Sequence, residues 1–367
     1  MTIRRIGVLT GGGDAPGLNP AIKAVVYKAD GMGIEVVGLC DGWSGLLDEL
    51  VGESVKLETH AVRRWDRDGG TNLGSSRTNP FRVVPAGGGE PRDRSAEVLA
   101  NMDRLGLDGL VAMGGEDTLG VAEKLCRQGA RIVGVPKTID NDLSGTDYTL
   151  GFATALRNCM NVIEQVRTPA GSHHWVQVLE VMGRHAGHLA LWTSAAGGAT
   201  LALIPEHPFS YAQVYRLVGE RIERGLRDRR YPRYAVIVVA EGATAAGDEM
   251  VTIEPGLDAF GHVRLGGIGN LLAERIRKDT PYEARAVVLG HVQRGGSPSA
   301  VDRIMGLAFG TAAVDAIARG ERGKMVSATG IVPAYTLSLV PLADAVGKLK
   351  TVDVERYYDT GRYNLKR

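Results

Sequence analysis

The chain has 367 residues, of which 44% are hydrophobic and 23% charged, a composition typical of soluble globular proteins. Its net charge of +1 does not indicate a nucleic-acid partner. Its three scattered cysteines, without a C-x-x-C pair, indicate neither a disulfide framework nor a structural zinc site. Because neither a signal-like segment nor a long apolar run occurs, the sequence predicts a cytoplasmic protein that does not bind membranes.

The length of the chain predicts two α/β lobes rather than one core. Short apolar runs alternate with amphipathic stretches, which is the pattern of parallel strands joined by crossover helices. The predicted strands are Ile6–Leu9, Glu35–Leu39, Gly109–Met113, Ile132–Val135, Val176–Met182, Leu201–Ile204, Ala235–Ala240 and Ala284–Leu289. The predicted helices are Asn19–Ala29, Arg94–Leu105, Thr118–Arg127, Gly151–Val166, Tyr211–Arg224, Gly267–Lys278 and Ala300–Ala318. The charged, glycine-rich connection Ser44–Pro91 is too long for a plain loop, so it is either functional or partly mobile.

Polar loops follow several of the predicted strands, where open α/β sheets bind their ligands. The first is Thr10-Gly11-Gly12-Gly13-Asp14-Ala15-Pro16-Gly17, between a strand and a helix. Glycines let the backbone approach an anion, and the helix N-terminus adds positive potential. The loop matches neither the P-loop nor the dinucleotide fingerprint, so a tight structural turn explains it equally well.

The second loop is Gly114-Gly115-Glu116-Asp117-Thr118. Its two glycines leave room for a phosphate, but its two acids would repel that phosphate unless a cation lay between them. This combination suggests Mg²⁺, which binds oxygen ligands and substrate phosphates. The alternative is capping of the following helix by Asp117 and Thr118.

The third loop is Pro136-Lys137-Thr138-Ile139-Asp140-Asn141-Asp142. Asp140 and Asp142 alternate, so in an extended segment they share one side. One of them can take a proton from an attacking hydroxyl while the other assists a metal ion. Lys137 supplies a cation for phosphate oxygens. The alternative is a turn rich in Asp and Asn.

The last two loops carry arginines. In Glu180-Val181-Met182-Gly183-Arg184-His185-Ala186-Gly187, Arg184 is predicted near a helix start. A cation is unfavourable there unless an anionic ligand or a surface carboxylate compensates it. Arg285 and Gly290-His291-Val292-Gln293-Arg294-Gly295-Gly296 place two arginines and a histidine around a strand end, which suits a sugar phosphate. Together the five loops predict an Mg-dependent cleft for phosphoryl transfer, without naming the donor or the sugar.

Six segments resemble the phosphofructokinase family in order and spacing, between Ile6 and about Ala318. They are Gly-Gly-Asp-Ala-Pro-Gly (12–17), Gly-Ser-Ser-Arg (74–77), Gly-Gly-Glu-Asp-Thr (114–118), Pro-Lys-Thr-Ile-Asp-Asn-Asp (136–142), Glu-Val-Met-Gly-Arg (180–184) and Gly-His-Val-Gln-Arg-Gly-Gly (290–296). The resemblance implies an α/β fold of two Rossmann-like lobes with mainly parallel sheets and the active site in the cleft between them. It assigns 1–151 with 293–343 to a lobe for the phosphate donor and Mg²⁺, and 152–292 with 344–367 to a sugar-phosphate lobe. It also implies a homodimer or homotetramer.

The resemblance further implies roles for single residues. The catalytic base falls on Asp140 and the transition-state arginine on Arg184, while Thr138 and Lys137 support the incoming phosphoryl group. Contacts to the phosphate donor fall on Gly13, Arg77, Gly115, Asp117, Thr118 and Lys137, and the metal contact falls on Glu116. Contacts to fructose 6-phosphate fall on Thr138, Asp140, Asp142, Met182, Gly183, Arg184, Glu241, Arg285, His291 and Arg294.

The family uses either ATP or pyrophosphate as the donor. Asp117 stands where the ATP enzymes typically have glycine, and Lys137 where the common bacterial ATP enzymes have glycine. This pair resembles the pyrophosphate-dependent type, which transfers a phosphoryl group reversibly to the 1-hydroxyl of fructose 6-phosphate in glycolysis and gluconeogenesis. An ATP-dependent enzyme is the alternative, and use of sedoheptulose 7-phosphate stays open.

Trp175 departs from the family pattern. After Ser-His-x the family usually has an arginine that reaches the sugar phosphate of the neighbouring subunit, whereas this chain has Ser172-His173-His174-Trp175. An indole cannot replace a guanidinium as a phosphate ligand. Two interpretations follow: weakened binding of fructose 6-phosphate, or packing of the indole at a subunit interface.

Overall fold

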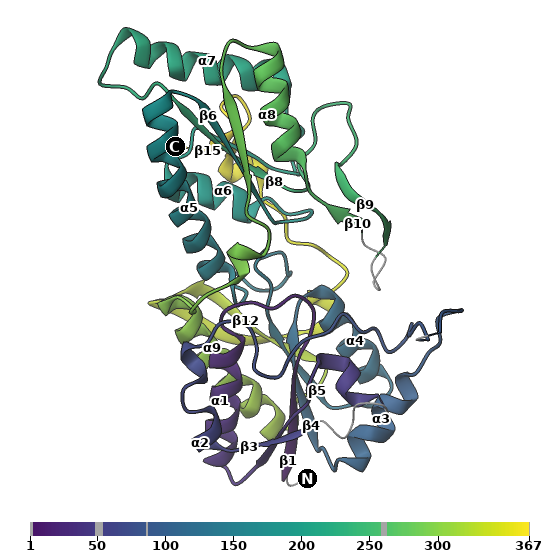
Figure 1. Cartoon of the computed structure of the whole chain (residues 1–367). Coiled ribbons are helices and arrows are strands. Elements are labelled where there is room, and N and C mark those ends of the chain that lie inside the picture. Colours follow the sequence, from purple (N-terminus) through teal and green to yellow (C-terminus); the bar gives the residue numbers. More distant parts are fainter. Residues whose placement is uncertain (1–2, 48–53, 86, 258–262, 367) are drawn as a thin grey trace. The chain divides into compact units, whose positions relative to one another are not determined.

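The computed structural model describes residues 3–47, 54–85, 87–257 and 263–366. The chain forms two compact units that alternate along the sequence. Unit 1 comprises Met1–Thr154 and Arg294–Leu349; unit 2 comprises Ala155–Asp258, His262–Gln293 and Lys350–Arg367. Each unit is an α/β structure with mainly parallel strands (Figure 1), so the predicted fold class is confirmed. The predicted position of the active site between the lobes, and their assignment to donor and sugar, remain predictions.

Unit 1 is built on one sheet with helices on both faces (Figure 1). Its strands, in spatial order, are β13 (Ala334–Pro341), β12 (Lys324–Ile331), β5 (Ile132–Pro136), β4 (Gly109–Gly114), β1 (Arg5–Thr10), β2 (Glu35–Gly38) and β3 (Val55–Leu57). The two edge strands, β13 and β3, are antiparallel to their neighbours, and the inner strands are parallel.

The two faces of this sheet have different helical cover, because side chains alternate along a strand. On β4, Val111 and Met113 pack into the cluster formed with α1 (Leu18–Asp30) and α9 (Ala300–Ala318). The intervening Leu110 and Ala112 pack into the cluster that contains α3 (Ser95–Arg104) and α4 (Glu116–Arg127). The short helix α10 (Leu342–Ala345) follows β13.

The helices α1 and α9 approach each other closely through glycines, although about 280 residues separate them in the sequence. A Cβ atom on Gly306 would lie 2.8 Å from the carbonyl oxygen of Gly17, and one on Gly310 would lie 2.3 Å from that of Ala21. Real Cβ contacts are longer, so these two positions of α9 require glycine. Helix α9 therefore completes the core that the N-terminal part of unit 1 begins.

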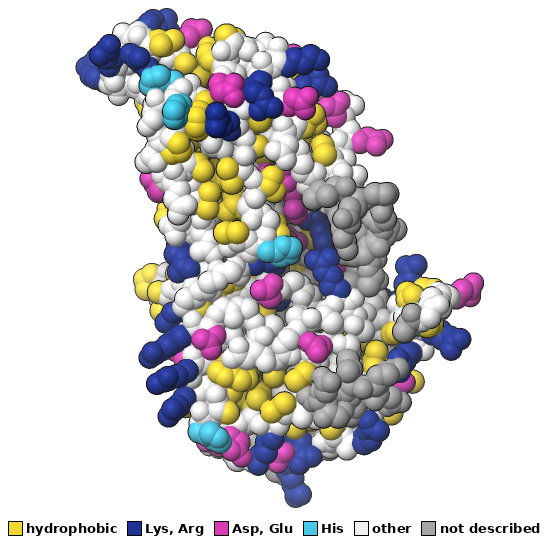
Figure 2. All heavy atoms as spheres, in the orientation of Figure 1, with side chains coloured by type: hydrophobic (Ala, Val, Ile, Leu, Met, Phe, Trp, Pro, Cys, Tyr) yellow, Lys and Arg dark blue, Asp and Glu magenta, His cyan; other side chains and the backbone are white. Residues whose placement is uncertain are grey.

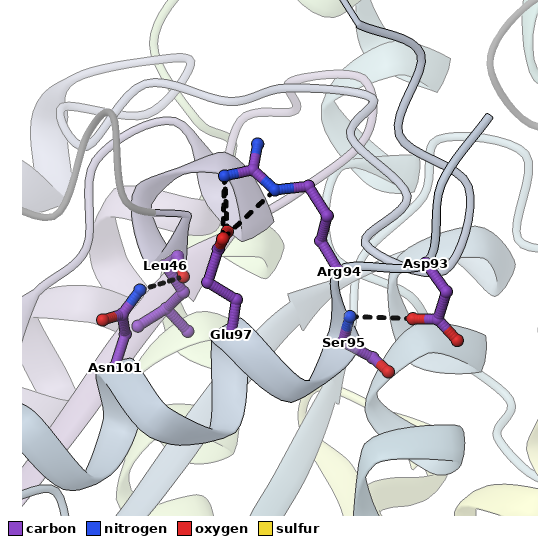
Figure 3. A network of polar contacts seen from close by, with 6 residues as sticks. All are labelled: Leu46, Asp93, Arg94, Ser95, Glu97 and Asn101. Carbon is purple, nitrogen blue, oxygen red and sulfur yellow. Dashed lines mark hydrogen bonds and ion pairs between the residues drawn. The ribbon is translucent and has the colours of Figure 1, made fainter. Parts of the chain in front are cut away.

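The long connection Ser44–Pro91 carries secondary structure where it is described. It includes β3, α2 (Thr59–Val62) and two single 3₁₀ turns, Gly42–Leu46 and Trp65–Arg67; residues 48–53 and 86 lie outside the described residues. One hydrogen bond ties this connection to α3: the Asn101 amide donates to the Leu46 carbonyl over 2.9 Å (Figure 3). At the start of α3, Asp93 accepts from the backbone N–H of Ser95 over 2.8 Å. An Arg94–Glu97 ion pair strengthens the same first turn of α3 (Figure 3).

Unit 2 contains a four-stranded parallel sheet in the order β11 (Ala284–Val288), β6 (Val176–Val181), β8 (Ala235–Ala240), β7 (Leu201–Leu203). Its helices are α5 (Phe152–His173), α6 (His188–Gly197), α7 (Tyr211–Arg227), α8 (Ile268–Asp279) and α11 (Val354–Tyr357). Two small antiparallel pairs join β9 (Thr252–Leu257) to β10 (Val263–Leu265) and β14 (Tyr358–Asp359) to β15 (Asn364–Leu365). Strands β6 and β8 are buried throughout, whereas the edge strand β11 is largely exposed.

Amphipathic patterning explains α7, whose residues Val214, Val218 and Ile222 are buried at helical spacing. Its exposed residues include Arg216, Arg224 and Arg227. Lys and Arg side chains, in dark blue, gather at the upper left of Figure 2, the region where one end of α7 lies in Figure 1. Helix α6 lacks such a pattern, because most of its residues are buried. That is why its sequence did not predict a helix.

Candidate active site

The loop that follows β1 surrounds the amine of Lys137. Gly12 and Gly17 have left-handed φ angles of 78° and 116°, a conformation that favours glycine. The Lys137 side chain is 2% exposed, and its Nζ donates to the carbonyl of Gly11 over 2.9 Å and also to that of Gly13. A cation is thus held under the glycine loop, next to the N-terminus of α1, which has no acidic residue in its first turn.

The environment of Lys137 disfavours its charge. The pKa of Lys137 is lowered from 10.5 to about 7, mainly by burial and next by the nearby cationic Arg294, while Asp14 and Asp140 act in the opposite direction. An anion bound in the glycine loop would raise the pKa of Lys137 again, because it favours the protonated amine. The arrangement therefore suits a multiply charged anionic ligand.

Close packing brings further polar groups against the glycine loop. Arg294 donates to the carbonyl of Asp14 over 2.9 Å, and a Cβ atom on Gly13 would lie 2.8 Å from its guanidinium nitrogen. A Cβ on Gly11 would meet the Thr118 hydroxyl at 2.6 Å. On the other side of the loop, the N–H of Gly12 donates to Ser76 over 3.0 Å, which brings the exposed Arg77 to this region. The structure thus brings Gly13, Thr118 and Lys137 together at one loop, with Arg77 directly after Ser76.

Acidic residues gather at the ends of the adjacent strands β4 and β5. Gly114 and Pro136, the last residues of these strands, are register partners. The pKa of Asp142 is raised to about 7, mainly by burial and also by the Asp140 and Glu116 carboxylates. All three acids follow the adjacent ends of β4 and β5. Such a group is electrostatically unfavourable without a cation.

Two alternatives from the sequence can be compared with the geometry here. Gly115 is the N-cap of α4 and makes no side-chain capping bond, so Asp117 and Thr118 are not the cap but lie in the first turn. The turn after β5 does exist: Asn141 has a left-handed φ of 53°, and the Thr149 hydroxyl donates to the Thr138 carbonyl over 2.6 Å.

Asp140 is the exception within this well-bonded turn. Its backbone N–H donates to the Thr138 hydroxyl over 3.1 Å, but its buried Oδ1 accepts no hydrogen bond from any described residue. A buried carboxylate oxygen without a donor is costly, and it remains available to a substrate hydroxyl or a cation. The third loop therefore combines a structural turn with one acid free to react.

No group of three or more His, Cys, Asp or Glu side chains is placed to hold a metal ion by itself in the described parts of the chain. Mg²⁺ is commonly held by one or two carboxylates, with substrate phosphates and water as its other ligands. The unpartnered oxygen of Asp140, near Glu116 and Asp142, fits that kind of site. The residues present are therefore compatible with Mg²⁺ bound together with a phosphate donor.

In unit 2, polar residues follow three neighbouring strands. Met182, Gly183 and Arg184 follow β6, Glu241 follows β8, and His291 follows β11. Because β11, β6 and β8 are parallel and adjacent, these five residues lie along one edge of the sheet.

Backbone geometry at the end of β6 is unusual. Gly183 has a φ of 142°, and a Cβ there would lie 2.6 Å from the Ala186 carbonyl oxygen; Arg184 has a left-handed φ of 43°. Positive φ in a bulky residue is uncommon and often accompanies a functional site. Among the described residues no carboxylate pairs with Arg184, so the surface salt bridge considered from the sequence is not observed in that part of the chain.

Two residues without a predicted role organise this edge. Gln293 is fully buried: its Oε1 accepts from the N–H of Met182 over 3.2 Å, and its Nε2 donates to Gly290 over 2.8 Å. Glu180, also buried, accepts from the N–H groups of Gly267 and Gly269 at 2.8–3.1 Å, which anchors the start of α8. The signal for Glu180 was that it is the single acid in a strand that is otherwise apolar except for Gln177. No signal distinguished Gln293 from its polar neighbours.

Within unit 2, Arg285 lies apart from the other predicted sugar-phosphate residues of that unit. Arg285 is the second residue of β11 and pairs with Gln177, the second residue of β6. It therefore lies about 10 Å along the strand from the carboxyl edge. Arg294 belongs to unit 1, where it donates to the glycine loop.

Comparison with known proteins identifies the family. Residues 5–317 match the phosphofructokinase family, which covers most of the chain. The chain belongs to the phosphofructokinase family. The resemblance inferred from six short segments is thereby confirmed, and the glycine loop, the acids after β5 and the end of β6 all lie within the matched region.

Relatives in this family differ in their named donor. A pyrophosphate--fructose 6-phosphate 1-phosphotransferase of Amycolatopsis methanolica is 50% identical over 96% of this chain and 97% of its own length. The ATP-dependent 6-phosphofructokinase 3 of Streptomyces coelicolor is 44% identical over 96% of this chain and 98% of its own length. Among solved structures, a phosphofructokinase chain of Saccharomyces cerevisiae matches with a TM-score of 0.77 and 28% identity over 93% of this chain, which spans 45% of that longer chain.

Within the described residues of this phosphofructokinase, no helix has the length and apolar character required to cross a membrane.

Proposed function

We propose that this phosphofructokinase transfers a phosphoryl group reversibly from pyrophosphate to the 1-hydroxyl of D-fructose 6-phosphate, giving fructose 1,6-bisphosphate and phosphate. The observation that carries the choice of donor is the pair of Lys137, buried under the glycine loop, and Asp117, in the first turn of α4. The pyrophosphate-named relative at 50% identity supports the same choice. As a cytoplasmic enzyme it would act in glycolysis and gluconeogenesis.

The donor proposal has a physical basis in charge. A protonated Lys137 attracts the compact, multiply charged pyrophosphate anion, together with Arg77 and the amides near Gly13, Gly115 and Thr118. The Asp117 carboxylate is bulky and negative where a nucleotide would place an additional phosphate. It therefore disfavours ATP by repulsion and by volume.

The phosphoryl acceptor is activated by Asp140 in this proposal. Its unpartnered oxygen takes the proton of the 1-hydroxyl as that oxygen attacks phosphorus. Thr138 and Arg184 stabilise the charge on the transferred group, since phosphoryl transfer relies mainly on positioning and electrostatic stabilisation. The sugar phosphate is bound by Met182, Gly183, Glu241, His291 and Arg294, with Asp142 near the acceptor.

Mg²⁺ is part of this proposal. Glu116 would hold it, with Asp142 and the donor oxygens, which leaves Asp140 as the base. When bound, it would neutralise the negative charge of the phosphate groups.

We further propose that the active form is a homodimer or homotetramer. The edge strand β11 leaves Val287 and Val288 36% and 44% exposed, and Val292 just after it is 66% exposed. An exposed apolar strand edge suits a second copy of the chain. Arg285, which lies on this strand away from its own carboxyl edge, would then contact the sugar phosphate bound by that second copy.

Initial rates with pyrophosphate and with ATP, at equal fructose 6-phosphate and Mg²⁺, test the proposed function. Pyrophosphate is expected to give the higher kcat/KM. A large preference for ATP would overturn the donor assignment and favour the second candidate, an ATP-dependent 6-phosphofructokinase, which the 44% identical Streptomyces relative supports.

A further inference from the structure

Trp175 lies against Arg285 within unit 2. The Arg285 guanidinium carbon is 4.1 Å from the centroid of the Trp175 ring, a cation–π distance. The indole also stacks on the His173 ring, with centroids 4.9 Å apart and planes inclined by 3°. Trp175 is only 8% exposed, whereas Arg285 is exposed. A buried aromatic platform therefore supports a solvent-facing cation.

Local structure explains why the platform is fixed. Helix α5 ends at His173, His174 turns the chain with a left-handed φ of 61°, and the N–H of Trp175 donates to the Ala170 carbonyl over 3.3 Å. Strand β6 begins at the next residue, Val176. The backbone on both sides of Trp175 is therefore held by hydrogen bonds.

The contact has a chemical consequence for Arg285. Stacking occupies the face of the planar guanidinium and leaves its five in-plane N–H donors free. None of the described residues accepts a hydrogen bond from this guanidinium. A flexible arginine on an exposed strand would otherwise lose side-chain entropy when it binds a phosphate, and the indole reduces that loss in advance.

We propose that Trp175 is a positioning residue for Arg285, holding its guanidinium by stacking so that its donors meet the phosphate of the sugar substrate. This inference rests on the proposed function, in which Arg285 binds the phosphate of fructose 6-phosphate. It differs from both interpretations of Trp175 drawn from the sequence: the indole neither leaves a gap in phosphate binding nor serves only an interface. It contributes to affinity through its neighbour.

The experiment compares Trp175→Leu, Trp175→Phe, Arg285→Ala and the double variant Trp175→Leu/Arg285→Ala. Trp175→Leu is expected to raise the KM for fructose 6-phosphate about two- to fivefold, the value of an exposed cation–π contact. The kcat and the KM for pyrophosphate should stay within about twofold, because Arg285 does not touch the donor. Trp175→Phe should retain most of the affinity: it keeps an aromatic face, and the indole N–H that it removes bonds to no described residue.

The double variant tests whether Trp175 affects the KM for fructose 6-phosphate through Arg285. If Trp175 acts through Arg285, adding Trp175→Leu to Arg285→Ala should leave the KM unchanged. Trp192→Leu is the matched control, because Trp192 is in the same unit but packs edge-on against Tyr357, and it should not alter the KM. Thermal unfolding and sizing chromatography of each variant check the fold and the oligomer, and Trp175→Met replaces Trp175→Leu if the latter does not fold.

The outcomes separate this inference from the proposed function. Active wild type with an unchanged KM in Arg285→Ala, or a Trp175→Leu effect that persists without Arg285, would overturn the inference and leave the proposed function standing. A dissociated oligomer in Trp175→Leu would likewise overturn it in favour of an interface role. A wild type that transfers no phosphoryl group to fructose 6-phosphate from either donor would overturn both.

Discussion

Replacing Lys137 by methionine tests the proposed donor site most directly. Methionine fills a similar volume without charge, so the change removes the donations to the Gly11 and Gly13 carbonyls and the cation under the loop. A charge-assisted hydrogen bond to an anion contributes about 1.5–3 kcal/mol. The affinity for pyrophosphate should therefore fall roughly ten- to a hundredfold. Folding should change less, because two unpaired carbonyls are offset by no longer burying an ammonium group.

The pH dependence gives this prediction a second readout. Since burial, together with the nearby charged groups, lowers the pKa of Lys137 from 10.5 to about 7, the free enzyme loses the cation as the pH rises through 7. Pyrophosphate binding should then weaken with rising pH and be accompanied by proton uptake. The unfolded chain binds this proton more tightly than the folded one, so the Lys137 contribution to stability falls as the pH drops from 10.5 to 7 and is constant below 7.

Isothermal titration calorimetry with pyrophosphate and Mg²⁺, in two buffers of different ionisation enthalpy, measures both affinity and proton uptake. Lys124→Met, on the exposed side of α4, is the matched control. Wild-type affinity and proton uptake in Lys137→Met would refute the reasoning, because the amine would then not contact the donor.

Three further predictions concern single residues. Asp140→Asn keeps the shape of the side chain but removes the proposed base. Steady-state kinetics should therefore show kcat about a hundred- to ten-thousandfold lower, with little change in substrate binding. A near-normal kcat would exclude Asp140 as the base. Asp117→Gly should lower activity with pyrophosphate and let ATP turnover appear in a coupled assay, and an unchanged donor preference would count against the charge argument. Glu180→Ala leaves the N–H groups at the start of α8 without their acceptor. Urea unfolding should therefore show a free energy of unfolding about 1–3 kcal/mol lower than that of the wild type. Wild-type stability would show that water replaces the carboxylate.

Much of the fold was predictable because apolar runs and glycine-rich ends follow simple periodicities. The predicted strand Ala235–Ala240 coincides with β8, and the predicted helix Ala300–Ala318 coincides with α9. The pattern missed α6, which is buried on most sides and has no amphipathic period. The pattern also missed β12 and β13. Buried and exposed residues alternate only partly along these two antiparallel strands, so neither shows a clear strand period.

The site was predictable as a set of loops but not in its internal geometry. Spacing placed Asp140 and Asp142 after a buried strand, yet no local rule indicated that Asp140 would keep an unpartnered oxygen. The direction of Lys137, back towards the first loop, depends on packing between segments about 125 residues apart. Trp175 was marked by its departure from the family pattern, but its neighbour Arg285 emerged only from the pairing of β6 with β11.

The glycine contact between α1 and α9 also has a consequence during synthesis. A ribosome that has completed residues 1–154 has made most of unit 1, but α9, which covers one face of its sheet together with α1, and the strands β12 and β13 are still missing. At about 5–20 residues per second, translation reaches the end of α9 roughly ten to thirty seconds later. During that interval the apolar surface of α1 around Ala21 and Ala24 has no partner. The nascent chain is therefore exposed to aggregation and to chaperones at this surface until α9 emerges and docks.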